Sequence, residues 1–227
     1  MRDPSVSKSA PSFAENTALF GPHSPAFSIC VYCASQQGRD PIHSRTAHAV
    51  GDWIGRHGGQ LVYGGSHAGL MGILADATLQ AGGRVVGIIP KALVDREFAH
   101  HGCTELHIVD NMHQRKFMMA ERATAFLALS GGIGTFEEFF EAWTWRQLGY
   151  HHKPVALLNT AGYYDTLLQF LEGSVTAGFM RHAQMEMIHV GTEVPDVLNY
   201  LAGPAEARVA DAAGSRLDLQ APPEGRA

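Results

Sequence analysis

The sequence predicts a single α/β domain in which a parallel β-sheet carries helices on both faces. Short, continuously apolar runs alternate with longer amphipathic runs along the chain. Continuous apolar runs are typical of strands buried on both faces, and their alternation with helical runs is typical of βα units. Glycine-rich turns follow two of the predicted strands, and such sheets bind ligands at the turns beyond the carboxyl ends of their strands.

The elements of the first half are marked by their apolar pattern and by their ends. A helix over 41–57 places His43, Ala47, Val50 and Ile54 on one face. Glycine pairs follow the second strand and the second helix, and Pro90 ends the third strand. The predicted elements are strands at 27–32, 60–63, 84–89 and 105–109 and helices at 41–57 and 70–81.

The second half continues this alternation. The run AFLAL at 125–129 is apolar throughout and is followed at once by Ser130, Gly131 and Gly132. It therefore predicts a buried strand that ends in a tight turn. The predicted elements are helices at 112–124, 135–148, 163–177 and 194–201 and strands at 125–129 and 154–158.

Composition shifts define the ends of the folded domain. Residues 1–25 are rich in Ser, Pro and Ala and lack a periodic apolar pattern, which predicts a flexible N-terminal arm. The stretch 203–227 predicts a disordered C-terminal tail. The folded domain is expected over 26–202, and an apolar content of 45% is enough to build its core.

Charge and cysteine content argue against several classes of protein. The formal net charge is -5 and the pI is about 6.2, so we expect no nucleic-acid partner and no anionic membrane surface. No apolar run approaches the roughly 18 residues of a membrane helix, and the N-terminus does not resemble a secretory signal. Three cysteines argue against a disulfide-stapled secreted fold, so we expect a cytoplasmic protein.

The two glycine-rich turns, at 63–72 and 130–135, are candidate phosphate sites. A backbone without Cβ atoms can approach a phosphate closely, and the first N–H groups of the following helix would point at the anion. Thr135 adds a hydroxyl and is a candidate N-cap. The alternative is that these glycines only allow tight turns. Neither turn is a Walker A loop or a dinucleotide fingerprint, so an NAD-type oxidoreductase is disfavoured.

Acidic and basic side chains lie near the second turn and at the start of the helix before it. Glu138 and Glu141 share one helix face, and Glu137 lies beside them. A carboxylate next to a phosphate site could stabilise positive charge on the sugar and orient or deprotonate water during glycosidic cleavage. Arg115 and Lys116 oppose their helix dipole, which favours a ligand role. The alternatives are dipole stabilisation for the carboxylates and a solvated helix end for the cations.

Other reactive side chains predict no site. Cys30 and Cys33 would point to opposite faces of a strand, so they cannot chelate one ion, and core packing is expected rather than a redox role. The histidine pairs at 100–101 and 151–152 fall in polar loops without a spaced carboxylate partner, so solvation is expected rather than metal binding. We expect no metal and no cofactor.

Three motifs, in order and at family spacing, resemble the Lonely Guy (LOG) family of cytokinin riboside 5'-monophosphate phosphoribohydrolases. They are YGG…GLMG at 63–72, MHQRK at 112–116 and GGIGTFEE at 131–138, and the resemblance covers about residues 27–200. It implies a Rossmann-like, doubly wound fold and hydrolysis of the N-glycosidic bond of purine nucleoside 5'-monophosphates. The products would be free base and ribose 5-phosphate.

The resemblance also implies residue roles and a homodimer whose helices complete the pocket. Arg115 and Glu138 match the family's catalytic pair. The substrate-binding positions are Gly64, Gly65, Glu97, Lys116, Gly131, Gly132, Ile133, Gly134, Thr135, Glu137 and Thr144.

Two positions depart from the family pattern, since Ser130 replaces a proline and Ser66 replaces a glycine. The family's older description as lysine decarboxylase finds no support, because no lysine in a pyridoxal-phosphate context is visible. A non-catalytic carrier of a nucleotide or molybdenum cofactor on the same fold remains the alternative. The sequence leaves open whether the preferred base is adenine or an N6-prenylated adenine.

Overall fold

Seven parallel strands form the centre of the computed structural model, which describes residues 25–94 and 98–204. Their order across the sheet is β4-β3-β2-β1-β5-β6-β7, and every neighbouring pair is parallel. This confirms the doubly wound α/β prediction. The strands are β1 (Ser28–Tyr32), β2 (Gln60–Tyr63), β3 (Arg84–Pro90), β4 (Glu105–Val109), β5 (Ala125–Ala128), β6 (Val155–Leu158) and β7 (Ile188–Gly191).

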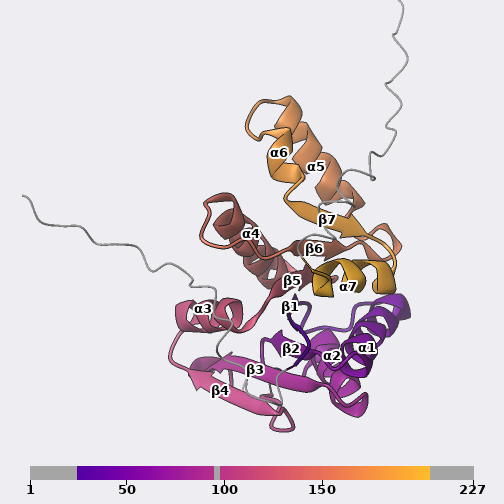
Figure 1. Cartoon of the computed structure of the whole chain (residues 1–227), viewed down its shortest axis with the longest axis vertical. Coiled ribbons are helices and arrows are strands. Elements are labelled where there is room, and N and C mark those ends of the chain that lie inside the picture. The colour runs from indigo at the N-terminus through magenta and orange to yellow at the C-terminus, as the bar shows by residue number, and fades with distance from the viewer. Residues whose placement is uncertain (1–24, 95–97, 205–227) are drawn as a thin grey trace, which may run out of the picture.

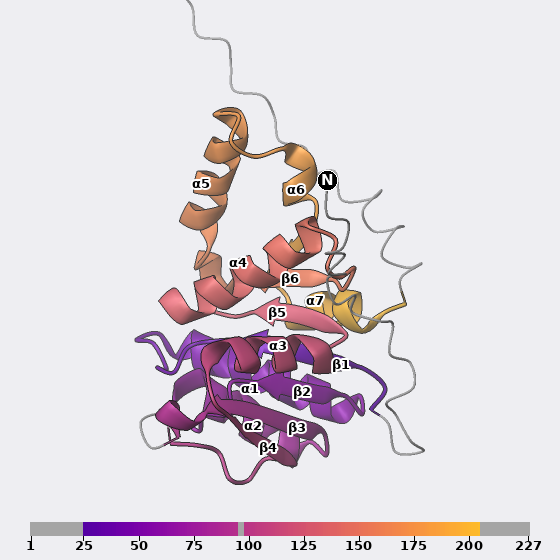
Figure 2. The ribbon, with the colours of Figure 1, turned by 90° about the vertical axis from the view of Figure 1, so that its left-hand side faces the viewer.

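Helices cover both faces of the sheet (Figures 1 and 2). Helices α1, α2 and α7 share one apolar core with the sheet, and α3, α4 and α5 share the other. In Figure 1, α5 and α6 extend beyond the β7 edge. The helices are α1 (Pro41–Arg56), α2 (Gly69–Gln80), α3 (Met112–Arg122), α4 (Ile133–Gln147), α5 (Asp165–Thr176), α6 (His182–Met185) and α7 (Val194–Ala202), with short 3-10 turns η1 (Lys91–Leu93) and η2 (Thr160–Gly162).

Strand β1 shows how alternate residues divide between the two cores. Ile29 and Val31 pack towards α1, α2 and α7, whereas Cys30 and Tyr32 pack towards α3, α4 and α5. Cys33, just beyond the strand, belongs to the first core. The two cysteines are thus buried on opposite sides of the sheet, as predicted, and burial raises the pKa of both thiols. Since the thiolate is the reactive form, this environment disfavours a redox role.

The loops that carry the candidate motifs meet beside the strand at which the winding reverses. The chain runs outwards from β1 to β4 and returns to place β5 beside β1. The Ala34 N–H donates to the Ser130 carbonyl at 3.2 Å, and the Leu70 N–H donates to the Ala34 carbonyl at 3.1 Å. The turns after β1, β2 and β5 are therefore contiguous at the ligand-binding edge of the sheet.

Several boundaries differ from those predicted. Helix α4 begins at Ile133, two residues before the predicted start, and the sequence pattern did not predict α6 or β7. Residues 1–24 and 205–227, which make up nearly all of the predicted arm and tail, lie outside the described residues. None of the described helices is long and apolar enough to cross a membrane.

Candidate active site

The turn between β5 and α4 presents an uncapped helix N-terminus. Gly132 occupies the N-cap position, and no side chain caps the helix. The first backbone bond of the helix runs from the Phe136 N–H to the Gly132 carbonyl at 3.0 Å. The N–H groups of Ile133, Gly134 and Thr135 therefore precede the intrahelical ladder, and they make this helix end a candidate anion site. Thr135 is buried at the third helical position, so the prediction that it caps the helix is wrong.

Hydrogen bonds from outside the turn fix the orientation of its peptide groups. The carbonyls of 129–131 accept, in order, from the Tyr164 hydroxyl at 2.6 Å, the Ala34 N–H at 3.2 Å and the Tyr163 hydroxyl at 2.6 Å. Because a trans peptide is planar, each following N–H faces away from these donors. Burial raises the pKa of Tyr164, which keeps its hydroxyl protonated as a donor.

The glycines of this turn differ in what surrounds them. A Cβ at Gly131 would lie 2.0 Å from the Thr135 Oγ1, so the turn needs glycine there to close over Thr135. A Cβ at Gly132 or Gly134 would meet nothing within 4 Å among the described residues. These two positions therefore leave open space next to the uncapped N–H groups.

Arg115 and Glu138 lie next to each other between α3 and α4, with most of their surface buried. The Arg115 Nη1 lies 3.9 Å from the Glu138 Oε1, and the side chains are 8% and 11% exposed. The Arg115 Nη2 donates to the Gly64 carbonyl at 3.3 Å, and Nη1 donates to the Met112 Sδ at 3.7 Å. Its Nε is buried without a hydrogen-bond partner among the described residues. A buried, unsatisfied donor is costly, and a ligand oxygen at this place would satisfy it.

The turn between β2 and α2 is packed tightly by the protein itself. A Cβ at Gly64 would lie 2.0 Å from the Arg115 Nη2. Gly65 has a φ of +75°, and its carbonyl accepts from the His100 N–H at 2.8 Å. Gly69 has a φ of +59°, and a Cβ there would lie 2.3 Å from the Ser35 carbonyl carbon. This turn therefore positions Arg115 and joins the neighbouring loops.

Comparison with known proteins finds relatives along most of the chain. A cytokinin riboside 5'-monophosphate phosphoribohydrolase of Rhodococcoides fascians is 45% identical over 178 residues, which are 78% of this chain and 90% of that protein. One from Arabidopsis thaliana is 42% identical over 173 residues, 76% of this chain and 81% of that protein. A family model described as "Possible lysine decarboxylase" matches residues 71–201. The chain belongs to the LOG family.

Solved structures with the same fold include more distant proteins. A molybdenum cofactor binding protein from Rippkaea orientalis has a TM-score of 0.59 and 20% identity, covering 76% of this chain and 93% of that one. The molybdenum cofactor carrier protein of Chlamydomonas reinhardtii has a TM-score of 0.55 and 21% identity, covering 82% and 97%. At these identities the likeness shows the Rossmann-like fold that this LOG-family chain shares with them.

Two of the predicted substrate-binding residues of this LOG-family chain bind each other. The Lys116 ammonium donates to Glu137 and, at 3.0 Å, to Glu141, and so joins α3 to α4. Burial opposes the charge on Lys116, but hydrogen bonds and attraction from the two carboxylates outweigh it and raise the pKa of Lys116. This brace holds the helix of Arg115 against the helix of Glu138.

Of the other predicted positions, Thr144 does not join this cluster. Thr144 is exposed on α4, seven residues beyond Glu137 and therefore on the same helix face, about two turns away. It lies away from the face that carries Glu138. Glu97 lies outside the described residues.

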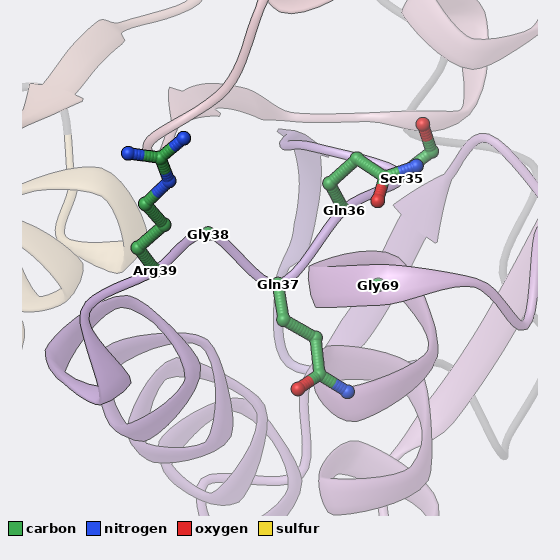
Figure 3. A pocket seen from close by; sticks show the side chains of 6 residues that line it. All are labelled: Ser35, Gln36, Gln37, Gly38, Arg39 and Gly69. Carbon is green, nitrogen blue, oxygen red and sulfur yellow. The ribbon is translucent and has the colours of Figure 1, made fainter.

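The structure adds a loop of this LOG-family site that the sequence did not reveal. An open pocket of about 590 Å³ lies at the end of β1, lined by Ser35, Gln36, Gln37, Gly38, Arg39 and Gly69. Figure 3 shows Arg39 on one side of it and Ser35 and Gln36 on the other. The residue just before this loop contacts the β5–α4 turn, since the Ala34 N–H donates to the Ser130 carbonyl.

His67, Asp76 and His100 have ligand atoms within 4.8 Å of one another, which is the spacing of a metal site. However, the His100 Nδ1 accepts from the Gly102 N–H at 3.1 Å, so its Nε2 carries the proton and donates to the Asp76 Oδ1 at 2.9 Å. Both ring nitrogens are therefore satisfied, and a metal ion at Nε2 would have to displace that proton.

The expectation of solvated loop histidines is wrong for His100 and His151, which are both buried. The His151 Nε2 donates to the Ala142 carbonyl at 3.0 Å, and its Nδ1 accepts from the Lys153 N–H at 3.2 Å. Burial lowers the pKa of His151 to about 4, so the ring packs as a neutral group. Both histidines belong to the folded structure rather than to the solvent layer.

Proposed function

We propose that this protein hydrolyses the N-glycosidic bond of purine nucleoside 5'-monophosphates of the adenosine or cytokinin type, releasing free base and ribose 5-phosphate. The observation that carries this proposal is the buried Arg115–Glu138 pair beside an uncapped helix N-terminus. Membership of the LOG family and the names of the relatives support it. A carrier needs an anion site but no such acid–base pair, and the molybdenum-cofactor proteins share only the fold.

In this arrangement the β5–α4 turn would bind the substrate, and Arg115 and Glu138 would act in the chemical step. The N–H groups of Gly132–Thr135 would hold the 5'-phosphate, which brings the ribose towards α4. Glu138 would stabilise the oxocarbenium-like sugar and deprotonate the attacking water. The C1'–N9 bond breaks with its electron pair passing to the base, the water oxygen bonds to C1', and the base takes up a proton. Arg115 would orient Glu138 or contact the departing purine. This chemistry requires no metal or cofactor.

Replacing one carboxylate tests the proposal. Glu138→Gln keeps the shape of the side chain but removes its charge, so we expect base release from AMP and isopentenyladenosine monophosphate to fall by about 10²- to 10⁴-fold. Binding of ribose 5-phosphate should remain. Glu121→Gln, the same change at an exposed position on α3, is the matched control. Retained turnover in Glu138→Gln would contradict the mechanism, and tight AMP binding by the wild type without free adenine would favour a carrier. Including GMP and CMP in the assay defines the preferred base.

We also propose that the protein acts as a homodimer in the cytoplasm. The family resemblance supports the dimer, and so do the exposed Leu148 and Tyr150 beyond the C-terminus of α4, close in sequence to Thr144. A partner over this end of α4 would bring Thr144 into a pocket. The three cysteines are free, which fits a reducing compartment. Light scattering on the purified protein measures the oligomeric state.

A further inference from the structure

Ser130, which replaces the family's proline in the β5–α4 turn, has a side-chain partner from a different element. Its Oγ lies 2.9 Å from the Nδ1 of His43, on the first turn of α1. Ser130 is buried and His43 is half-buried. The sequence pattern assigned His43 only to the face of a helix. The structure instead places its ring against the turn that we propose binds phosphate.

The His43 ring also lies beside Tyr163 and close to the pocket loop. It packs edge-on against Tyr163 with 5.4 Å between ring centroids, and the Tyr163 hydroxyl anchors the Gly131 carbonyl. A Cβ at Gly38 would lie 3.4 Å from the His43 Cδ2, so the ring also borders the loop that lines the pocket. A change in the charge of His43 would therefore act directly beside the turn.

The proton count of His43 decides which way the Ser130 hydroxyl donates. When the neutral ring carries its proton on Nε2, Nδ1 accepts and the Ser130 hydrogen is used in this bond. When the ring is protonated, Nδ1–H donates to the Ser130 Oγ, and the hydroxyl hydrogen is released to an acceptor at the turn. The protonated ring also adds a positive charge beside the turn. A histidine ordinarily makes this change between pH 5 and 8.

We propose that His43 is a positioning residue whose protonation, acting through Ser130, strengthens the binding of a dianionic oxyanion at the β5–α4 turn. This inference rests on the anion site of the proposed function and adds a pH-dependent control to it. The phosphate of a nucleoside monophosphate is such an oxyanion. Substrate binding would therefore tighten as the pH falls through the range in which His43 gains its proton.

The other ionisable groups on the neighbouring segments have partners of their own or are of types that keep their charge state between pH 5 and 8. Asp40 caps α1, where its carboxylate accepts from the Ile42 N–H at 2.9 Å. Asp165, at the start of α5, accepts from the Asn159 side chain at 2.7 Å. Tyr163 donates to the turn, and Arg39, in the pocket loop, stays charged throughout. Of this set, only His43 belongs to a residue type whose charge ordinarily changes between pH 5 and 8.

Sulfate is the appropriate probe because it remains a dianion across this pH range, unlike phosphate. We expect calorimetry to show wild-type sulfate affinity rising about tenfold from pH 8 to pH 5.5, as for one added charge-assisted hydrogen bond. His43→Ala should abolish this pH dependence. His43→Asn, which can still bond Ser130 but cannot titrate, should keep the wild-type affinity at pH 8 and show no pH dependence. Ser130→Ala removes the hydroxyl, so it should keep only the part of the pH dependence of sulfate affinity that comes from the charge of the His43 ring.

His48→Ala, at an exposed position on the same helix, is the matched control and should keep the full pH dependence. A wild type without pH dependence, or a His43→Asn variant that retains it, would overturn the inference. The measurement does not require catalysis. Base release without the pH effect would therefore refute this inference alone, whereas the pH effect without base release would refute only the proposed enzyme activity.

Discussion

The two glycine-rich turns of this sheet are similar in sequence but differ in what occupies the space beside their glycines. At the β2–α2 turn, the Cβ positions of Gly64 and Gly69 are taken by Arg115 and by the Ser35 backbone. At the β5–α4 turn, the Cβ positions of Gly132 and Gly134 are open. A glycine-rich turn after a strand thus predicts that another group approaches the backbone closely, but not whether that group belongs to the protein or to a ligand. In the first turn the partner is the protein itself, and in the second the described chain leaves the space open.

The helix ends that follow the two turns differ in the same way. At α2, the Leu70 N–H already donates to the Ala34 carbonyl, which joins the helix to the β1 loop. At α4, the first N–H groups follow a glycine N-cap that has no side chain to satisfy them. We infer that the β5–α4 turn holds the phosphate, while the β2–α2 turn acts on the reaction through Arg115.

Of substitutions at the two turns, the larger effect is expected from filling the packed β2–α2 turn. Gly64→Ala would place a methyl group 2.0 Å from the Arg115 Nη2, so the guanidinium must shift from its place beside Glu138. A displacement of about 1 Å in a catalytic group can cost 10²-fold, and we expect kcat/KM to fall by at least about this factor. Overpacking should also cost about 1–3 kcal/mol of stability.

Steady-state base release and urea unfolding measure both effects of Gly64→Ala. Gly173→Ala on α5, where a Cβ meets nothing within 4 Å, is the control and should leave activity unchanged. Wild-type kcat/KM in Gly64→Ala would show that the Arg115 position does not matter for the reaction.

A smaller and more selective effect is expected at the open turn. Gly132→Ala adds a methyl group where the described chain leaves space, so the melting temperature should stay within a few degrees of the wild type. Its φ of -103° is also accessible to alanine. The methyl group would obstruct a phosphate that approaches the backbone, and we expect KM for AMP to rise about tenfold with a smaller change in kcat. An unchanged KM would place the phosphate elsewhere and remove the distinction between the two turns.

Much of the fold was predictable because its signals are local. The apolar runs predicted six of the strands, and glycine pairs marked the ends of two of them. Strand β7 escaped because it is a four-residue edge strand that is only partly buried, so it lacks a continuous apolar run. The start of α4 was placed two residues late because glycine, rather than a polar side chain, occupies the N-cap.

The candidate site was predictable only where its residues fall in motifs. Arg115 and Glu138 lie in recognisable stretches, and the structure brings them together. His43, Tyr163 and Tyr164 act on the β5–α4 turn from 87, 32 and 35 residues away in sequence. No local pattern reports such contacts, since they arise when the chain reverses its winding direction at β1. The packing of Gly64 against Arg115 could not be predicted for the same reason, since the two residues are 51 positions apart in the sequence.

The smallest expected effect tests the pairing of Lys116 with Glu137 and Glu141, which joins α3 to α4. The pKa of Lys116 is raised in the folded state, so the stabilisation is fully present below the ordinary value of 10.5 and is lost as the pH rises through the raised pKa. Lys116→Gln should therefore unfold about 0.5–1 kcal/mol more easily than the wild type at pH 8, and the difference should shrink above pH 10.5. Urea titrations at both pH values measure it, with Lys91→Gln at an exposed position as the control. If the difference in unfolding free energy between Lys116→Gln and the wild type does not change with pH, Lys116 stabilises the fold by packing its aliphatic stem. The contact between the helices of Arg115 and Glu138 would then not depend on the charge of Lys116.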